Sequence, residues 1–348
     1  MRTADFDYIL PPDRIAQSPV EPRDAARLMV LRRSERRMEH HLVRDLPALL
    51  RPGDLLVLNN TRVIPARLRG HKPGTGGAVE IFLLEPRADG TWDALMRARR
   101  RPRPGARILL GPMDDAEAEL LEDLGDGKVR VTLRTPEPFD AWLESAGEAP
   151  LPPYIRRTPD DARRAVDRER YQTVYARHPG AIAAPTAGLH FTPALLDRLS
   201  ASGVGRAELT LHVGIGTFRP VTAELAEDHP MEAERYHVPE STVEALVRTR
   251  AAGGRIVAVG TTATRTLETV AAQGWPPRAG EGRSALYIRP PYEFKAVDAL
   301  LTNFHLPCST LLMLVSAFAG RDFVREAYDL AIREEYRFYS YGDAMLIL

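Results

Sequence analysis

The sequence predicts an α/β main domain, with a mostly parallel or mixed sheet flanked by helices, and a small β-barrel domain inserted into it. Beyond residue 153, short apolar strands alternate with helices, which is typical of a sheet covered on both faces. Between residues 63 and 153 the chain changes to short alternating runs separated by glycine and proline turns, which is typical of a barrel. We therefore expect a catalytic domain of residues 1–62 and 154–348, and an inserted barrel of residues 63–153.

The first strand of the main domain covers residues 54–58, an apolar run that follows a turn at Gly53. It delivers the polar residues Asn59, Asn60, Thr61 and Arg62 at its carboxyl end. Inside the insertion, alternating runs over residues 79–84, 107–110 and 128–133 predict barrel strands.

The second part of the main domain begins with a helix over residues 194–200. Thr192 is a suitable N-cap, Pro193 suits the first turn, and Gly203 ends the helix. The elements expected after it are strands over residues 207–213, 255–259, 284–288 and 298–303, and helices over residues 263–272, 309–319 and 322–336.

Composition excludes several classes of protein. The 47 basic and 47 acidic residues cancel, so the chain is not a uniformly basic nucleic-acid binder. Its single cysteine, Cys308, cannot form an intrachain disulfide or a Cys-x-x-Cys zinc site. The acidic start of the chain does not have the pattern of a signal peptide. We therefore expect the protein in a reducing cytoplasm. Residues 299–320 are uncharged, but polar residues interrupt them, which predicts a buried strand and helix rather than a membrane span.

The arginines are unevenly distributed. Residues 97–107 hold six arginines and no acid, residues 156–170 hold six more, and residues 114–126 hold seven acids and no base. Each arginine cluster is either a solvated face or a phosphate-binding patch.

A small-residue turn joins the strand that ends at Val259 to the next helix. Gly260, Thr261 and Thr262 would expose free backbone N–H groups at the positive end of that helix, where a carboxylate or phosphate binds well. The alternative is plain threonine capping, since neither the phosphate-loop lysine nor the dinucleotide glycine pattern is present.

Three histidines, His190, His212 and His305, stand at or just beyond apolar elements. The carboxyl ends of strands are where open α/β sheets collect ligands, so general acid–base catalysis is a role for any of them. The alternatives are histidines that only pack in the core and a metal site, although their spacing matches no zinc pattern. Asp343, a lone acid in a nearly uncharged tail, is either a turn-capping residue or a ligand-binding one.

Six long sequence motifs follow the DFDY of residues 5–8, in order along the chain. They are GDLLVLNNTRVIPAR (residues 53–67), APTAGLHF (184–191), LHVGIGTF (211–218), VGTTATR (259–265), LLTNFHLP (300–307) and YRFYSYGDAM (336–345). Together they resemble the S-adenosylmethionine:tRNA ribosyltransferase-isomerase family of queuosine biosynthesis. The resemblance covers the chain, with the inserted region matching less densely.

The resemblance implies an enzyme that transfers and isomerises the ribosyl unit of S-adenosylmethionine onto 7-aminomethyl-7-deazaguanine at the wobble position of tRNA. The products are epoxyqueuosine, adenine and methionine. S-adenosylmethionine is then a consumed substrate, so no cofactor and no metal are expected. The implied partner is tRNA, with no membrane and no obligate protein partner.

The resemblance also suggests site residues. We expect His190, His212 and His305 as catalytic acid–base candidates, with Thr261, Thr262 and Arg265 at the methionine carboxylate. The other expected substrate-binding residues are Asn60, Arg62, Asn303 and Asp343. The arginines expected to bind tRNA are Arg97, Arg99, Arg100, Arg101, Arg156 and Arg157.

The sequence departs from the family pattern at two positions. The family often has a histidine where Glu232 stands and a basic residue where Cys308 stands. The first departure weakens any catalytic role for residues 229–234, and the second indicates that the Cys308 side chain is not chemically required. Two other functions stay open, a non-catalytic RNA-binding module and a histidine-metal hydrolase.

Overall fold

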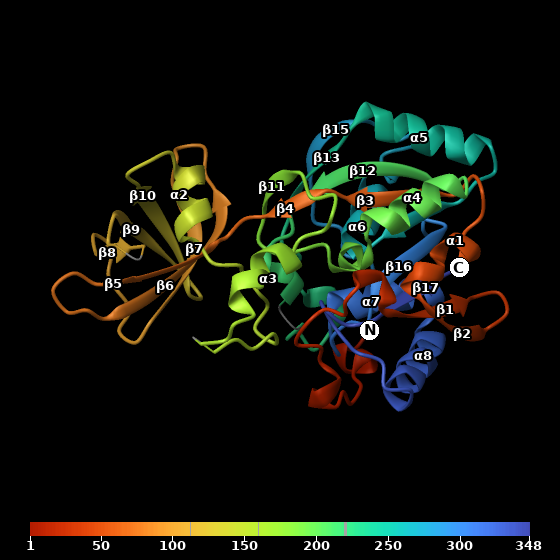
Figure 1. The fold of residues 1–348 in the computed structure, drawn as a ribbon, viewed down its shortest axis with the longest axis horizontal. Helices are drawn as coiled ribbons and strands as arrows, with labels where there is room; N and C mark the ends of the chain where they lie inside the picture. Colours follow the sequence, from red (N-terminus) through yellow and green to blue (C-terminus); the bar gives the residue numbers. More distant parts are fainter. Residues whose placement is uncertain (112, 159, 219–220) are drawn as a thin grey trace.

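The structure, a computed structural model, describes residues 1–111, 113–158, 160–218 and 221–348. A large mixed sheet with helices on its two faces forms the main body, and a closed barrel lies beside it (Figure 1). This arrangement confirms the predicted fold class. The division of the chain at residues 63 and 153 stays a prediction.

The sheet has nine strands, and its four central strands are parallel neighbours. Their order is β15 (Gly280–Ser284), β13 (Glu234–Val238), β12 (Gly205–Leu211), β3 (Leu55–Asn59), β14 (Ile256–Val259), β16 (Ala299–Asn303), β17 (Ala344–Ile347), β1 (Arg27–Arg32) and β2 (Arg37–Leu42). All residues of β3, β14 and β16 are buried, as expected for strands covered on both faces. Four strands thus bring their carboxyl ends to one edge of the sheet.

Helices cover both faces because successive residues of each strand point to opposite sides. Leu55 and Val57 pack in one core with the helices α5, α6, α7 and α8, whereas Leu56 and Leu58 pack in a second core with α1 and α4. The bounds are α1 (Leu46–Leu49), α4 (Pro193–Ala201), α5 (Glu240–Ala251), α6 (Thr261–Ala271), α7 (Thr310–Ala319) and α8 (Arg321–Arg333). The predicted cap is confirmed, since the Thr192 hydroxyl accepts a hydrogen bond from the Leu195 N–H at 3.1 Å.

The barrel closes from six strands in the order β10, β7, β6, β5, β8 and β9. They are β5 (Arg67–His71), β6 (Ala78–Pro86), β7 (Trp92–Ala98), β8 (Arg107–Leu110), β9 (Ala116–Gly125) and β10 (Lys128–Arg134). Helix α2 (Phe139–Ala146) packs Trp142 and Leu143 into the barrel core. At the neck between barrel and sheet, β4 (Thr61–Val63) pairs with β11 (His178–Ala181), and α3 (Arg164–Arg170) lies nearby (Figure 1).

Short 3₁₀ turns complete the described elements. They cover Thr3–Phe6, Pro12–Arg14, Arg23–Ala25, Val43–Asp45, Thr186–His190, Ile215–Phe218 and Ala226–Asp228.

Two predicted strands differ from the structure. The strand expected over residues 284–288 is wrong, because β15 ends at Ser284. β15 pairs with β13, and this pairing places Gly282 against the Tyr236 side chain. Such a contact between strands sets the bounds of β15, and the periodicity of the sequence does not reveal it. β12 begins and ends two residues earlier than expected, so His212 follows the strand instead of lying within it.

The sequence analysis did not anticipate the β1–β2 hairpin, β13 or α5. The uncharged segment of residues 299–320 is buried as β16 and α7, as predicted. Among the described residues, none of the helices combines the length and apolarity needed to cross a membrane.

Candidate functional site

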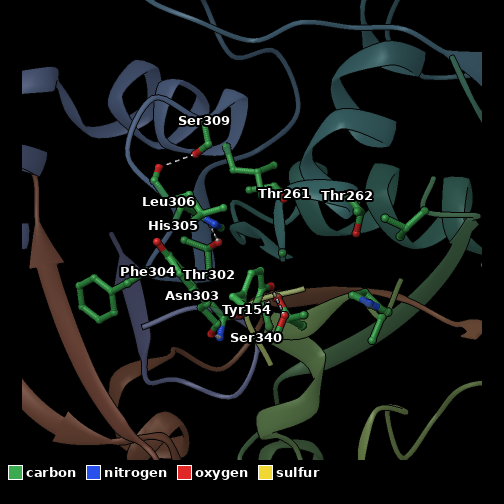
Figure 2. Close-up of a pocket in the computed structure, with 18 residues that line it drawn as sticks. Tyr154, Thr261, Thr262, Thr302, Asn303, Phe304, His305, Leu306, Ser309 and Ser340 are labelled. Atoms are coloured by element: carbon green, nitrogen blue, oxygen red, sulfur yellow. Dashed lines mark hydrogen bonds between the residues drawn. The ribbon is translucent and has the colours of Figure 1, made fainter. Parts of the chain in front are cut away.

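A hollow opens at the carboxyl ends of β14 and β16, beside the start of α6 (Figure 2). We call it the neutral hollow, because no described residue that lines it is acidic or basic apart from His305. Its cavity volume is about 60 Å³, and the figure rises to about 640 Å³ when the open solvent at its mouth is included. Its lining residues are Tyr154, Ala184, Pro185, Thr186, Ala187, Val213, Gly260, Thr261, Thr262, Thr302, Asn303, Phe304, His305, Leu306, Ser309, Leu311, Tyr339 and Ser340.

The start of α6 gives the neutral hollow its hydrogen-bond donors. Gly260 has a φ of +88°, a conformation that glycine adopts without strain and that turns β14 directly into α6. Because glycine has no side chain, the first N–H groups of α6 have no side-chain cap. Thr262 accepts a hydrogen bond from Asn59 Nδ2 at 3.2 Å, whereas the Thr261 hydroxyl has no hydrogen-bond partner among the described residues although Thr261 is only 6% exposed.

His305 lies in the wall of the neutral hollow, just after β16 (Figure 2). Tyrosines hold its backbone from two sides: Tyr8 Oη donates to the His305 carbonyl at 2.5 Å, and the His305 N–H donates to Tyr328 Oη at 2.9 Å. Its Nε2 lies 2.9 Å from Thr302 Oγ1. Burial lowers the pKa of His305 to about 3, so the ring is neutral at pH 7.

His190 does not line the neutral hollow but lies behind Asn303. Asn303 Nδ2 donates to the Tyr339 carbonyl at 3.1 Å, which fixes the orientation of the amide, and Nδ2 also lies 3.2 Å from His190 Nε2. His190 Nε2 therefore accepts, and Nδ1 carries the proton of the neutral ring. Burial, with Arg337 and Arg23 nearby, lowers the pKa of His190 to about 3. His190 thus orients Asn303, whose Oδ1 accepts from the Thr186 hydroxyl at 3.1 Å.

His212 opens onto a different space, which we call the junction hollow because it lies between the barrel and the sheet. Its lining includes Glu85, Asp93 and Lys128 of the barrel and Gly180, His212, Glu232 and Arg235 of the main domain. His212 Nδ1 lies 2.9 Å from Thr61 Oγ1, and a Cβ at Gly180 would come within 2.8 Å of the imidazole. Burial, with Arg235 and His178 nearby, lowers the pKa of His212 to about 4.

A third space, the charged hollow, adjoins the neutral one. It is lined by Gly216, Thr222, His229, Pro230, Met231, Glu232, Glu234, Arg265, Thr310 and Leu311. Arg265 Nη2 donates to Glu234, and the other Glu234 oxygen accepts from the Gly214 N–H at 2.8 Å. The structure therefore separates Arg265 from Thr261 and Thr262, which the sequence analysis grouped together.

Three other predicted substrate-binding residues lie outside the neutral hollow. Asn60 Nδ2 donates to Glu208 at 3.1 Å, and its Oδ1 accepts from Thr210. The two Asp343 oxygens accept backbone N–H groups of Arg27 and Arg337 at 3.0 and 2.8 Å. Arg62 is exposed, with its guanidinium 4.0 Å from Glu144. The protein itself hydrogen-bonds both polar side-chain atoms of Asn60 and of Asp343, which favours a structural role for both.

Two aromatic residues of the neutral hollow were missed as site residues. The rings of Tyr154 and Tyr339 lie 4.8 Å apart between centroids, and Tyr154 Oη lies 2.6 Å from Ser340 Oγ. Tyr339 has a φ of +71°, which is unusual for a bulky residue and typical of functional sites. The tail string YSYG was a signal for Tyr339. Nothing local marks Tyr154, which is 186 residues from Ser340 in the sequence.

The two arginine clusters differ in how far they are neutralised. Arg99 and Arg100 are exposed and have no ion pair with a described residue, while Arg101 pairs with Asp123 at 2.7 Å. In the second cluster, most arginines pair with acids: Arg157 with Asp167, Arg163 with Asp161, Arg164 with Glu148, Arg168 with Glu144 and Arg170 with Glu21. Arg97 and Arg156 line the groove between barrel and α3.

Metal ligands do not gather in the part of the chain that the structure describes. Across residues 1–111, 113–158, 160–218 and 221–348, no three side chains among His, Cys, Asp and Glu are placed to share a metal ion.

Comparisons with known proteins point to one family. The chain matches the family described as queuosine biosynthesis protein over residues 3–347. It is 56% identical to the S-adenosylmethionine:tRNA ribosyltransferase-isomerase of Thermus thermophilus, over 99% of this chain and 98% of that protein, and 52% identical to the protein of that name from Moorella thermoacetica, over the full length of both. A crystal structure of the S-adenosylmethionine tRNA ribosyltransferase of Thermotoga maritima matches with a TM-score of 0.55 and 42% identity, over 99% of this chain and 100% of that one.

Proposed function

The chain belongs to the family of queuosine biosynthesis proteins, and from this premise we propose that the neutral hollow binds S-adenosylmethionine for the transfer of its ribosyl unit to tRNA. The activity is that of an S-adenosylmethionine:tRNA ribosyltransferase-isomerase. The observation that carries this conclusion is identity above half over the whole length of the relatives of that name. The non-catalytic RNA-binding module is not favoured.

In this proposal the acceptor is the aminomethyl group of 7-aminomethyl-7-deazaguanine at the wobble position. The sulfonium acidifies C5′ of the ribose, a base removes a C5′ proton and adenine leaves. The tRNA amine then attacks, and closure of the epoxide expels methionine. Such a route needs a proton acceptor, a proton donor for adenine and a pocket that keeps water out.

The neutral hollow supplies several of these features. The Tyr154 and Tyr339 rings offer an aromatic wall for adenine. Such ring faces would also stabilise a cation, here the sulfonium, by roughly 0.5–2 kcal/mol per ring. Thr261, Thr262 and the first N–H groups of α6 are in place to donate to substrate oxygens. His305 lies in the wall of the hollow and is the candidate acid–base residue there.

The other predicted residues have indirect or separate roles in this proposal. His190 acts by orienting Asn303. Asp343 holds the backbone at Arg27 and Arg337, while Asn60 holds the side chains of Glu208 and Thr210. His212 faces the junction hollow, where the acceptor base would enter beside the barrel, and Arg62 lies exposed on β4 near the neck between sheet and barrel. Exposed arginines of the barrel, including Arg97, would bind tRNA phosphates together with Arg156. Arg157, whose side chain is 8% exposed, stays paired with Asp167. The enzyme would work in the cytoplasm without a protein partner.

Product analysis tests the proposal directly. The purified protein, incubated with S-adenosylmethionine and tRNA carrying 7-aminomethyl-7-deazaguanine, should release adenine and methionine in a 1:1 ratio. The same tRNA with guanine at that position should release neither. Release of adenine that does not depend on the aminomethyl group would contradict a transfer to tRNA.

We also propose that the reaction uses no metal, because the activating charge is the sulfonium and the histidine rings are engaged by Thr302, Asn303 and Thr61. Turnover should therefore survive exhaustive treatment with EDTA. Loss of turnover that zinc or another divalent ion restores would count against this.

A further inference from the structure

Hydroxyl groups in the wall of the neutral hollow lead to further hydroxyls buried behind it, and the latter have no hydrogen-bond partner among the described residues. Given the proposed function, on which this inference rests, we propose that these hydroxyls form a relay that supplies the proton for the leaving adenine. Tyr154 and Ser340 are the end of the relay in the neutral hollow, and Tyr171 and Tyr341 continue it into the protein.

The pair in the neutral hollow lies beside the place proposed for adenine. Tyr154 Oη and Ser340 Oγ are 2.6 Å apart, and both residues line the hollow (Figure 2). The Tyr154 ring belongs to the aromatic wall proposed for adenine, and Ser340 directly follows Tyr339, the other ring of that wall. The hydroxyl pair is therefore placed to donate to a ring nitrogen of a base that packs there.

Other polar groups of the neutral hollow are less suited to this role. The Thr186 hydroxyl already donates to Asn303 Oδ1 at 3.1 Å. The Ser309 hydroxyl donates to the Leu306 carbonyl at 2.7 Å. Burial lowers the pKa of His305 to about 3, so at pH 7 this ring does not hold the second proton of an imidazolium. Among side-chain hydroxyls, the phenol of a tyrosine is the most acidic.

Tyr171 lies behind the pair, outside the lining of the neutral hollow. It is 1% exposed, and its hydroxyl has no hydrogen-bond partner within the described part of the chain. Burial raises the pKa of Tyr171 well above its usual range, and Tyr154 and Ser340 are among the groups near enough to affect it. Because the buried phenol does not ionise, it can give up its proton only as another proton replaces it. A buried hydroxyl without a partner costs free energy, which favours a function over a purely structural role.

Tyr341 continues the relay toward solvent. Its ring meets the Tyr171 ring edge-on, with centroids 6.0 Å apart, and its hydroxyl also has no partner among the residues that the structure describes. Burial, and then the charge of Asp167, raise the pKa of Tyr341. Asp167 and its ion-pair partner Arg157 line the groove between the barrel and α3. The hydroxyls thus lead from the neutral hollow to a groove that opens to solvent.

One proton enters the neutral hollow for each adenine that leaves. The bond between C1′ of the ribose and N9 of adenine breaks, its electron pair stays on adenine, and the hydroxyl that faces the base donates a proton to a ring nitrogen. Each hydroxyl behind it passes a proton forward, so none is left ionised, and water in the groove supplies the last proton. The proton that the base removes from C5′ returns to solvent, which balances the step. Single buried waters would bridge hydroxyls that are too far apart to bond directly.

Tyrosine-to-phenylalanine variants separate a proton relay from a structural role. Tyr171→Phe and Tyr341→Phe remove hydroxyls that make no hydrogen bond to the described residues, so thermal unfolding should show both variants to be at least as stable as the wild type. In single turnover with saturating substrate tRNA, each should release adenine about tenfold more slowly at saturating S-adenosylmethionine. The concentration of S-adenosylmethionine that gives half of the maximal rate should stay the same.

Tyr175→Phe is the matched control. Tyr175 is also buried, and its hydroxyl also lacks a partner among the described residues. It packs in the second core with Phe191, however, and the charged groups near it are Glu208 and Arg206. This variant should release adenine at the wild-type rate.

A second substrate tests whether the relay acts on the leaving base. An S-adenosylmethionine analogue that carries 2-fluoroadenine has a better leaving group, because the fluorine withdraws electrons and stabilises the departing base without a proton. The loss of rate in Tyr171→Phe should therefore shrink to about threefold or less with this analogue. A variant that only disturbs the shape of the neutral hollow would slow both substrates equally.

The outcomes are distinct. Equal rates of adenine release in Tyr171→Phe and Tyr175→Phe, or the same loss of rate with both substrates, overturns the relay and leaves the proposed function standing. Wild-type protein that releases no adenine from S-adenosylmethionine in the presence of substrate tRNA overturns the proposed function, and the relay with it.

Discussion

His190 and His305 are only 5% and 7% exposed and have no acidic partner among the described residues, and this couples the stability of the protein to pH. Burial lowers the pKa of each to about 3, below the value of about 6.5 in the unfolded chain. The unfolded state therefore binds more protons between pH 6.5 and about 3, and stability rises with pH in that window. The stabilisation is fully present above pH 6.5 and is lost as pH falls toward 3.

We expect the free energy of unfolding to fall by about 2 kcal/mol for each of these histidines between pH 6.5 and 5, at about 1.4 kcal/mol per unit. Urea unfolding at a series of pH values measures it. His190→Gln should flatten the slope, while His237→Asn, at an exposed position of β13, should not. A wild-type slope that is flat between pH 7 and 5 would disprove the coupling.

Cys308 is the sole thiol, and its surroundings make it a poor nucleophile. Burial and Asp7 raise its pKa, so the thiolate is scarce at neutral pH. We expect Cys308→Ser to keep turnover within about twofold of wild type, since the tRNA amine is the nucleophile of the proposed reaction. Mass spectrometry of the enzyme during turnover should find no adduct at Cys308.

The backbone at Cys308 supplies a control for that prediction. Its φ is +52°, where a β-branched side chain is strained. Cys308→Val should lower the free energy of unfolding by roughly 1–2 kcal/mol, whereas Cys308→Ser should not. Loss of turnover in well-folded Cys308→Ser, or a trapped thioether, would show that the thiol takes part in the chemistry.

At the scale of elements, the pairing of β4 with β11 positions His212. The pairing places Thr61 beside the imidazole and Gly180 beneath it, with a φ of +144° at Gly180 and no room for a Cβ. We expect Gly180→Ala to displace the ring from the place where the acceptor amine would enter, and so to lower kcat by roughly tenfold or more and to change the pH profile. The KM for S-adenosylmethionine should change little, because the neutral hollow is not touched.

Gly274→Ala is the control for Gly180→Ala. Gly274 has a similar φ of +133° but open space around it, so it tests the backbone strain without the clash. Equal losses of kcat in both variants would attribute the effect to strain and remove His212 from the mechanism.

At the scale of the whole molecule, a neutral protein must attract tRNA through a local patch. The barrel arginines are the better candidates, because Arg99 and Arg100 have no ion pair among the described residues while most of the cluster near α3 is paired with acids. Changing Arg99, Arg100 and Arg101 together to Ala should raise the KM for tRNA. In a plot of log affinity for tRNA against log salt concentration, the slope should also become shallower by roughly 0.7–0.9 for each phosphate that the variant no longer binds.

Turnover of this triple variant at saturating tRNA should stay close to wild type, because the hollows at the sheet edge are intact. The matched triple variant at Arg163, Arg168 and Arg170 removes three arginines that already pair with acids, so its salt slope should change less. An unchanged slope in the barrel variant would move the tRNA site off the barrel.

The local structure at the site could be predicted from sequence patterns alone. The turn at Gly260, the cap at Thr192 and the strand that ends in Asn59 depend on residues close together in the chain, and periodicity and capping report such features well. The fold class followed from the same local patterns.

Which polar side chains of the predicted site keep free hydrogen-bonding groups depends on the tertiary structure. His190 lies 113 residues from Asn303, and Asp343 lies 316 residues from Arg27, whose N–H donates a hydrogen bond to it. No local pattern in the sequence shows that these hydrogen bonds are already made. Tyr154 reaches the neutral hollow from the far side of the insertion, and Arg265 faces a different space from Thr261 although both lie on α6. A polar side chain is free to bind a ligand only when the protein does not satisfy it, and that depends on contacts between distant residues.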